Sequence, residues 1–143
     1  MPGNRSRKET LVYRQYLKQL PADVCQFCAI TPQSPVYIKE GKHFLIAKNL
    51  FPYSVWDESP VSDHLLLIPK HHTDHLAGLS DEAALEYMSW LTEYERQGYS
   101  SYARAPKVKT KSVVHQHTHL IKVKGKRKRL FMHIRKPYVR VSI

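Results

Sequence analysis

The chain has 143 residues, which is enough for one domain with one modest hydrophobic core. A hydrophobic content of 42% and a charged content of 24% fit a folded globular protein and exclude a disordered tail or a collagen-like repeat. The formal net charge of +11 is unevenly distributed: residues 1–95 carry 9 basic and 12 acidic side chains, whereas residues 96–143 carry 14 basic and no acidic ones. This asymmetry points to a polyanionic partner.

Hydropathy and the cysteines set expectations about location. No apolar run approaches the roughly 20 residues of a membrane-spanning helix, and the first five residues lack the apolar stretch of a signal peptide. We therefore expect a cytoplasmic protein without a membrane partner. In a reducing compartment, the spacing of Cys25 and Cys28 favours a metal half-site or a redox pair over a structural disulfide, with an ordinary pair of buried thiols as the alternative.

The first half of the chain predicts one helix and three strands. Apolar residues at three- and four-residue spacing indicate an amphipathic helix over residues 7–20, at the edge of the domain, that ends at Pro21. Segments 36–38 and 44–47 flank a turn and predict a β-hairpin. After an irregular stretch, the apolar run 64–68 is typical of a central strand.

A long helix is predicted next. Ser80 has the features of an N-cap and Gly98 those of a stop, with a helix of about four turns between them. The apolar stripe that we expect to face the sheet consists of Ala84, Leu85, Met88, Leu91 and Tyr94.

Three further strands complete the predicted sheet. They cover residues 99–105, 112–123 and, after a basic turn at Gly125, 130–141. The order of elements predicts a single α+β domain with a mostly antiparallel sheet of about five strands. In this division the N-terminal helical extension covers residues 1–22, and the basic turn with the last strand covers 122–143.

Three histidines alternate within the predicted strand 112–123. His115, His117 and His119 would therefore point to the same face, with about 7 Å between successive members. Three imidazoles on one face suit a metal, a phosphate, or a nucleophilic histidine supported by its neighbours. Three solvated strand histidines are the alternative.

Several separated motifs carry a resemblance to a known family. The pattern His-x-His-x-His followed by Leu120-Ile121 resembles the signature of the histidine-triad superfamily of nucleotide hydrolases and transferases. Segments 49–53 and 64–72 resemble the two other landmarks of that family, and Gly98-Tyr99 and Ser112 stand at its usual distances from the triad. The resemblance implies a histidine-triad-like (HIT-like) fold. It also implies a homodimer joined through the long helix and the neighbouring strand.

The same resemblance implies a reaction. The nucleophile would be His117, which attacks the α-phosphorus of a nucleoside 5′-phosphoryl compound; water would then release the nucleotide from a nucleotidyl-histidine. His119 would contact the phosphate or the leaving group, and Ser112 would donate a hydrogen bond there. His115 completes the triad. His64 stands where the family often has a supporting histidine, with a satisfied core histidine as the alternative.

Nucleotide-binding positions follow in the same way. Asn49 matches the ribose-binding position of the family. The apolar residues near it that would sandwich the base are Phe44, Ile46 and Leu50. Where the family commonly has an Asn and a Gly-Gln pair, this chain has Arg104 and Thr110-Lys111. Arg104 and Lys111 would clamp phosphate by charge; a solvated basic loop is the alternative for the lysines of this stretch.

Other departures from the family concern residues 55–61 and the triad strand. Residues 55–61 are extra length that forms either a lid over the nucleotide or a surface loop, and Trp56 stacks on a base or fills a gap. Gln116 and Thr118 are more polar than the usual apolar spacers of the triad. We therefore expect the back of this strand to be less buried than in the family.

A structural zinc site is implied by some branches of the superfamily, among them the galactose-1-phosphate uridylyltransferases. The matching ligands in this chain are Cys25, Cys28, His72 and His115. Such a set is a closed tetrahedral site that organises the fold without activating water. His71 and His75 are alternatives for His72.

These observations predict a nucleotidyl hydrolase that acts on a dinucleoside polyphosphate or a nucleoside phosphoramidate. A nucleotidyltransferase or phosphorylase of the same superfamily is the first alternative. The second is a nucleic-acid-binding or RNA- or DNA-end-processing protein that uses the basic segment Lys122–Arg129 to follow a phosphate backbone.

Overall fold

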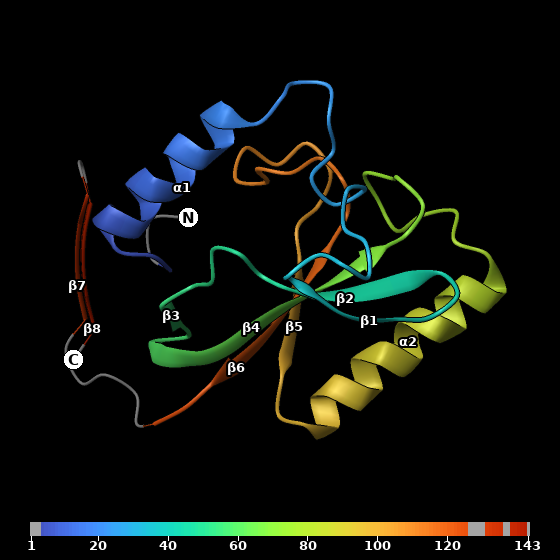
Figure 1. Cartoon of the computed structure of the whole chain (residues 1–143). Helices are drawn as coiled ribbons and strands as arrows, with labels where there is room; N and C mark the ends of the chain where they lie inside the picture. Colours follow the sequence, from blue (N-terminus) through green and yellow to red (C-terminus); the bar gives the residue numbers. More distant parts are fainter. Residues whose placement is uncertain (1–3, 126–130, 136–137, 143) are drawn as a thin grey trace.

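An antiparallel sheet with the path β1-β2-β4-β6-β5 organises the fold, and β3 pairs with the start of β4 (Figure 1). The computed structural model describes residues 4–125, 131–135 and 138–142. The strands of this sheet are β1 (Tyr37–Glu40), β2 (Phe44–Lys48), β3 (Val55–Trp56), β4 (Ser59–Pro69), β5 (Ser100–Ala103) and β6 (Thr118–Val123). The predicted α+β class and mostly antiparallel sheet are confirmed.

Two helices lie on opposite sides of this sheet (Figure 1). Helix α1 (Arg7–Gln19) begins with a capping box, in which Ser6 and Glu9 each accept a hydrogen bond from the other's backbone N–H. Helix α2 (Asp81–Arg96) begins at the cap Ser80, and Gly98 follows it with a φ of +85°, which glycine adopts readily. Neither of these two helices has the length and apolar character needed to cross a membrane.

The apolar stripe predicted for α2 is right at its C-terminal end and wrong in the first turns. Leu91 and Tyr94 pack on the core as predicted, whereas Leu85 is 73% exposed and Met88 56% exposed. In the earlier turns the residues that pack on the core are Ala83, Tyr87 and Trp90. Both sets have helical spacing, and the two aromatic rings face the sheet because they bury more apolar area.

The two faces of the sheet hold separate core clusters. Phe44 and Ile46 of β2 point toward α2, where they pack with Leu65 and Leu67 of β4. The alternate residues of the same strands face the other way, in a cluster that contains Leu45, Ala47, Leu66, Ile68 and Phe27. This second face is the one that carries the triad histidines, because Phe27 contacts the rings of His115 and His117.

Residues 55–61 form a tight hairpin. Strand β3 pairs with Ser59 and Pro60 at the start of β4, across a two-residue turn of Asp57 and Glu58. Both turn residues have positive φ angles, 46° and 59°, which is the backbone that two-residue hairpins favour. Residues 55–61 are therefore a hairpin that leads into the long strand β4.

Two strand predictions need correction. Strand β6 begins only at Thr118, so His115 and His117 precede it, in the segment that follows the loop 104–112. The single last strand predicted over 130–141 is in fact two strands, β7 (Phe131–Arg135) and β8 (Tyr138–Ser142), which pair antiparallel in a separate sheet. The basic run Lys126–Arg129 and Leu130 lie outside the described residues.

Candidate functional site

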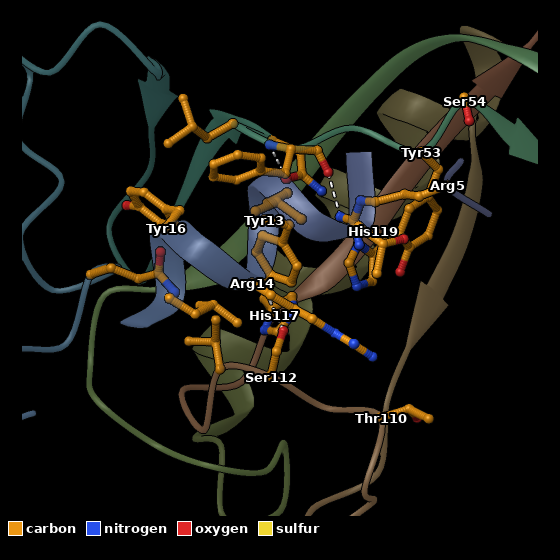
Figure 2. A pocket seen from close by; sticks show the side chains of 18 of the residues that line it. Arg5, Tyr13, Arg14, Tyr16, Tyr53, Ser54, Thr110, Ser112, His117 and His119 are labelled. Atoms are coloured by element: carbon orange, nitrogen blue, oxygen red, sulfur yellow. Dashed lines mark hydrogen bonds between the residues drawn. The ribbon is translucent and has the colours of Figure 1, made fainter. Parts of the chain in front are cut away.

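A cavity of about 1260 Å³ lies between α1 and the triad side of the sheet (Figure 2). Its walls come from residues 5–17 of the N-terminal segment, residues 26–36, the connection 48–55 that follows β2, Leu66 of β4, and residues 104–119. His117, His119 and Ser112 line it, together with Asn49 and Leu50. The structure thus brings most of the predicted catalytic side chains to one cavity.

His117 is a buried, neutral imidazole at this cavity. Its Nδ1 lies 2.9 Å from the carbonyl oxygen of His115, and since a carbonyl can only accept, Nδ1 carries the proton. Burial lowers the pKa of His117 to about 4. At neutral pH Nε2 therefore has a free lone pair, which is the form a nucleophilic imidazole needs.

His119 and His64 form a hydrogen-bonded pair whose tautomers can be assigned. The backbone N–H of Tyr53 donates to His64 Nδ1 over 3.0 Å, so the neutral His64 ring carries its proton on Nε2. That Nε2 lies 2.9 Å from Nδ1 of His119, which must accept. The proton of His119 is then on Nε2, and no hydrogen bond among the described residues uses it. His119 is thus a donor at the cavity.

Burial keeps this pair uncharged. It is the main cause that lowers the pKa of His64 to about 3 and that of His119 to about 2. Arg5 lowers both further by its charge, and Arg104 acts in the same direction on His119. The amide nitrogen of Asn49 lies 3.1 Å from His64 Nε2, while its Oδ1 accepts from the Phe51 N–H at 3.0 Å. Asn49 therefore adjoins the histidine pair at the wall of the cavity.

Helix α1 is bound tightly over these residues. The hydroxyls of Tyr13 and Ser112 share a hydrogen bond, and the rings of Tyr13 and Tyr16 pack on Phe51 with centroids 5.1 and 4.8 Å away. The segment before the helix is also tied down, because the carbonyl of Asn4 accepts from the Ser54 N–H at 2.9 Å. The helix predicted to lie at the domain edge is a wall of the cavity.

The proposed base sandwich of Phe44 and Ile46 is wrong. Both are fully buried in the core cluster under α2, on the far face of the sheet. Side chains alternate between the two faces of a strand, so the residues of β2 and β4 that face the cavity are the ones next to these in sequence. The apolar side chains that line it there are Phe27, Ile30, Val36 and Leu66, together with the predicted Leu50.

Arg104 and Lys111 have different positions. Arg104 is only 6% exposed and lines the cavity; its guanidinium donates to the hydroxyls of Thr110, at 2.7 Å, and Tyr53, at 3.2 Å. Lys111 does not line the cavity, and its ammonium donates to the Asp74 carbonyl and to the side chain of Gln116. These two hydrogen bonds join two loops outside the cavity wall, and the phosphate clamp at Lys111 stays a prediction.

Two further expectations about the triad region are corrected. Gln116 and Thr118 are both buried, Gln116 against Lys111 and Thr118 through a 2.9 Å hydrogen bond with the hydroxyl of Tyr87. Polar partners make burial of these spacers acceptable. Trp56 lies parallel to the Tyr53 ring, with centroids 5.8 Å apart, and is not in the cavity wall. Its ring also contacts that of Tyr102, with centroids 5.1 Å apart.

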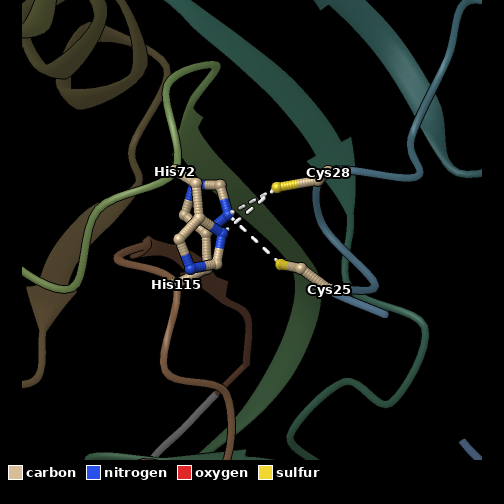
Figure 3. Close-up of side chains that lie close together, drawn as sticks. All are labelled: Cys25, Cys28, His72 and His115. Carbon is tan, nitrogen blue, oxygen red and sulfur yellow. Dashed lines mark hydrogen bonds between the residues drawn. The ribbon is translucent and has the colours of Figure 1, made fainter. Parts of the chain in front are cut away.

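A second cluster lies at the end of β4, outside the cavity (Figure 3). It consists of Cys25, Cys28, His72 and His115, whose ligand atoms all lie within 4.8 Å of one another. His72 Nδ1 is 3.2 Å from the sulfur of Cys28, and His115 Nδ1 is 3.4 Å from that of Cys25. These are the four residues that the resemblance indicated, with His72 in place of the alternatives His71 and His75.

The donor set fits a tetrahedral metal site. Zinc bonds of about 2.3 Å to sulfur and about 2.0 Å to nitrogen place ligand atoms at the corners of a tetrahedron roughly 3.3–3.8 Å apart. His115 Nε2 donates to the Pro69 carbonyl at 2.9 Å, so its Nδ1 is the unprotonated nitrogen that faces the sulfurs. His115 is absent from the cavity wall. His115 therefore links the two sites: its side chain belongs to the second cluster, and its carbonyl oxygen accepts from His117.

Comparison with known proteins adds information about the fold. No family model and no curated protein matches the sequence. A HIT family hydrolase from Legionella pneumophila Philadelphia 1 is similar in structure, with a TM-score of 0.51, 23% identity, and coverage of 72% of this chain and 94% of that one. A HIT family hydrolase from Clostridium thermocellum has a TM-score of 0.51 and 19% identity, with coverage of 71% of this chain and 92% of that one. A "Hit Like Protein" has a TM-score of 0.50 and 20% identity, with coverage of 79% of this chain and 98% of that one.

This chain has the histidine-triad fold. The predicted fold is confirmed by these likenesses and by the sheet order described above. Within the histidine-triad fold, what sequence reasoning missed is the contribution of the N-terminal segment. Arg5, Tyr13 and Arg14 all line the cavity, yet helical periodicity records only which residues are apolar, and says nothing about which distant segment they meet.

Proposed function

We propose that this protein is a nucleotide hydrolase that works through a nucleotidyl-histidine at His117. The observation that carries the proposal is the state of His117: a neutral imidazole with its proton held on Nδ1 by a carbonyl and its Nε2 lone pair free, at the wall of a large cavity. The similar structures from Legionella pneumophila and Clostridium thermocellum are described as HIT family hydrolases, which supports hydrolase chemistry.

In the proposed reaction, His117 Nε2 attacks the α-phosphorus of a nucleoside 5′-phosphoryl compound. A phosphorus–nitrogen bond forms as the bond to the leaving group breaks. The N–H on His119 Nε2 is available to donate a hydrogen bond to the leaving atom, and the N–H on His64 Nε2 holds His119 in this tautomer through their 2.9 Å hydrogen bond. Water then attacks the phosphorus, breaks the bond to nitrogen and releases the nucleoside monophosphate.

The phosphate would be held by groups that donate hydrogen bonds. The Ser112 hydroxyl and the Arg104 guanidinium both line the cavity wall near the triad, and arginine binds phosphate oxygens in pairs. Asn49 stands at the position proposed for the ribose. The four residues of the second cluster would hold zinc, which in such a closed site supplies rigidity: it would tie the segment 25–28 to the end of β4 and to His115.

The test is hydrolysis by His117 variants. We expect the unchanged protein to release AMP from diadenosine triphosphate or from AMP-morpholidate, and His117→Ala to lose at least about a thousandfold in kcat, as loss of a covalent nucleophile does. His71→Ala is the matched control, because His71 is an exposed histidine outside both sites. Hydrolysis by His117→Ala at the unchanged rate would refute the assignment. Addition of inorganic phosphate to the AMP-morpholidate reaction tests the transferase alternative, since a phosphorylase would form ADP there in place of AMP.

A further inference from the structure

The cavity has an unusual charge for its size. Its lining includes six basic side chains, Arg5, Arg7, Arg14, Lys48, Arg104 and Lys109, and no Asp or Glu. None of the ion pairs among the described residues includes any of these six. Three of the six, Arg5, Arg7 and Arg14, come from the N-terminal segment, which therefore supplies much of the positive potential in front of His117 and His119.

Arg5 is the most constrained of these cations. Its guanidinium lies 4.7 Å from the ring centroids of both Tyr13 and Tyr53 and donates to the Phe51 carbonyl. Its Nε is buried and has no hydrogen-bond partner. Burial also lowers the pKa of Arg5, and the charge of Glu9, which acts in the opposite direction, does not offset this effect. An anion in the cavity would compensate it.

Arg104 stands on the other side of the same tyrosine. It donates to the Tyr53 hydroxyl, while Arg5 lies over the Tyr53 ring. Both hydroxyls that accept from Arg104 are neutral, and most of its five N–H donors remain available. The Tyr53 ring is stacked on that of His119, with centroids 5.5 Å apart. Two guanidinium groups therefore flank Tyr53 beside the histidine that faces the leaving group.

We propose that the N-terminal segment forms a second subsite, in which Arg5 and Arg14, together with Arg104, bind a phosphate chain on the leaving group. The inference rests on the proposed function, because only that reaction defines a leaving group. It narrows the substrate class to nucleotides joined through phosphoanhydride bonds. Volume supports it: about 1260 Å³ exceeds the roughly 300–1,000 Å³ of most small-molecule sites.

The direct test is the binding of inorganic tripolyphosphate, measured by calorimetry. We expect the unchanged protein to bind it and the variant Arg5→Gln/Arg14→Gln to bind about tenfold more weakly, because two charge-assisted contacts are lost. Arg14→Gln alone, at an exposed position that cannot affect folding through burial, should show part of this loss. Lys8→Gln is the control: Lys8 is exposed on the same helix but does not line the cavity.

Besides a complete lack of binding, two results would overturn the subsite. One is tripolyphosphate binding by Arg5→Gln/Arg14→Gln that equals that of the unchanged protein. The other is an equal loss in Lys8→Gln, which would reflect general charge. Absence of any binding by the unchanged protein would also refute it. This measurement does not depend on turnover, so it decides about the subsite even where the hydrolase proposal fails.

A kinetic comparison links the subsite to the leaving group. Diadenosine triphosphate loses ADP, an anion, whereas AMP-morpholidate loses a neutral amine. The double arginine variant should lower kcat/KM about tenfold for the first substrate and change the second less than about twofold. An equal fall for both substrates would show that α1 supports the site only structurally, and would contradict the proposal. Failure of the unchanged protein to cleave either substrate would instead refute the proposed function.

Discussion

The hydroxyl of Tyr13 on α1 is hydrogen-bonded to the hydroxyl of Ser112, 99 positions later in the chain. Ser112 stands beside the triad, at the position proposed to contact phosphate, so this bond ties the N-terminal helix directly to the reaction site. The packing of Tyr13 and Tyr16 on Phe51 strengthens the same junction. Binding of phosphate at Ser112 must therefore either displace the Tyr13 hydroxyl or include it.

The first prediction concerns this bond. Tyr13→Phe should lower the free energy of unfolding by about 1 kcal/mol, the net value of a typical hydrogen bond. In a Ser112→Ala background the same change should cost much less, because the partner is already absent. Urea denaturation of the four proteins in the cycle measures the coupling. Tyr16→Phe is the control, since Tyr16 packs on the same Phe51 ring; equal effects of the two substitutions would contradict the prediction.

The second prediction concerns metal content. Purified protein should contain about one equivalent of zinc per chain, and Cys25→Ser should retain far less, because the tetrahedral site loses one of its four ligands. Elemental analysis after dialysis measures this. The variant should also unfold at a lower temperature, whereas His71→Ala should keep both metal and stability. A protein that retains no zinc after purification with zinc in the buffer would contradict the assignment.

The third prediction concerns pH. The pKa of His119 lies near 2 in the folded protein and near the ordinary 6.5 when unfolded, with burial as the main cause. Below pH 6.5 the unfolded chain therefore binds a proton that the folded chain refuses, so stability falls as pH falls. Between pH 7.5 and 5.5 this one group should remove about 1.4 kcal/mol.

The comparison that isolates this effect uses His119→Gln. Urea denaturation at pH 7.5 and at pH 5.5 gives the loss of stability for each protein. The unchanged protein should lose about 1.4 kcal/mol more than the variant over this interval, while the other histidines and the metal ligands contribute to both. Equal losses would show that the folded protein accommodates a charged His119.

The fourth prediction concerns self-association. The resemblance implies a homodimer joined through the long helix and its neighbouring strand, and the structure leaves Leu85 and Met88 of α2 exposed, with β5 at the edge of the sheet. We propose that these side chains are covered by a second copy of the chain. Sedimentation should show a dimer that Leu85→Glu/Met88→Glu converts to monomer. Val12→Glu is the control, since Val12 is 51% exposed on α1; a monomeric unchanged protein would contradict the proposal.

Local sequence patterns were sufficient for most elements of the fold. The caps at Ser80 and Gly98, the hairpin of β1 and β2 and the central strand β4 each depend on interactions within a few residues, and each was predicted near its observed position. The four residues of the metal cluster were also indicated in advance, because the family resemblance ties them together across 90 positions. Spacing alone indicated only the half-site of Cys25 and Cys28.

By itself, the sequence determined the triad, the cysteine pair and the alternation of helix and strand, because these are properties of neighbouring residues. Only the tertiary structure decided which face each of them meets. It turned Phe44 and Ile46 toward α2, engaged Lys111 with Asp74 and Gln116, and placed α1 over the triad. Those outcomes depend on packing between segments far apart in the chain, such as Tyr13 and Ser112, and periodicity within one segment contains no record of its distant partner.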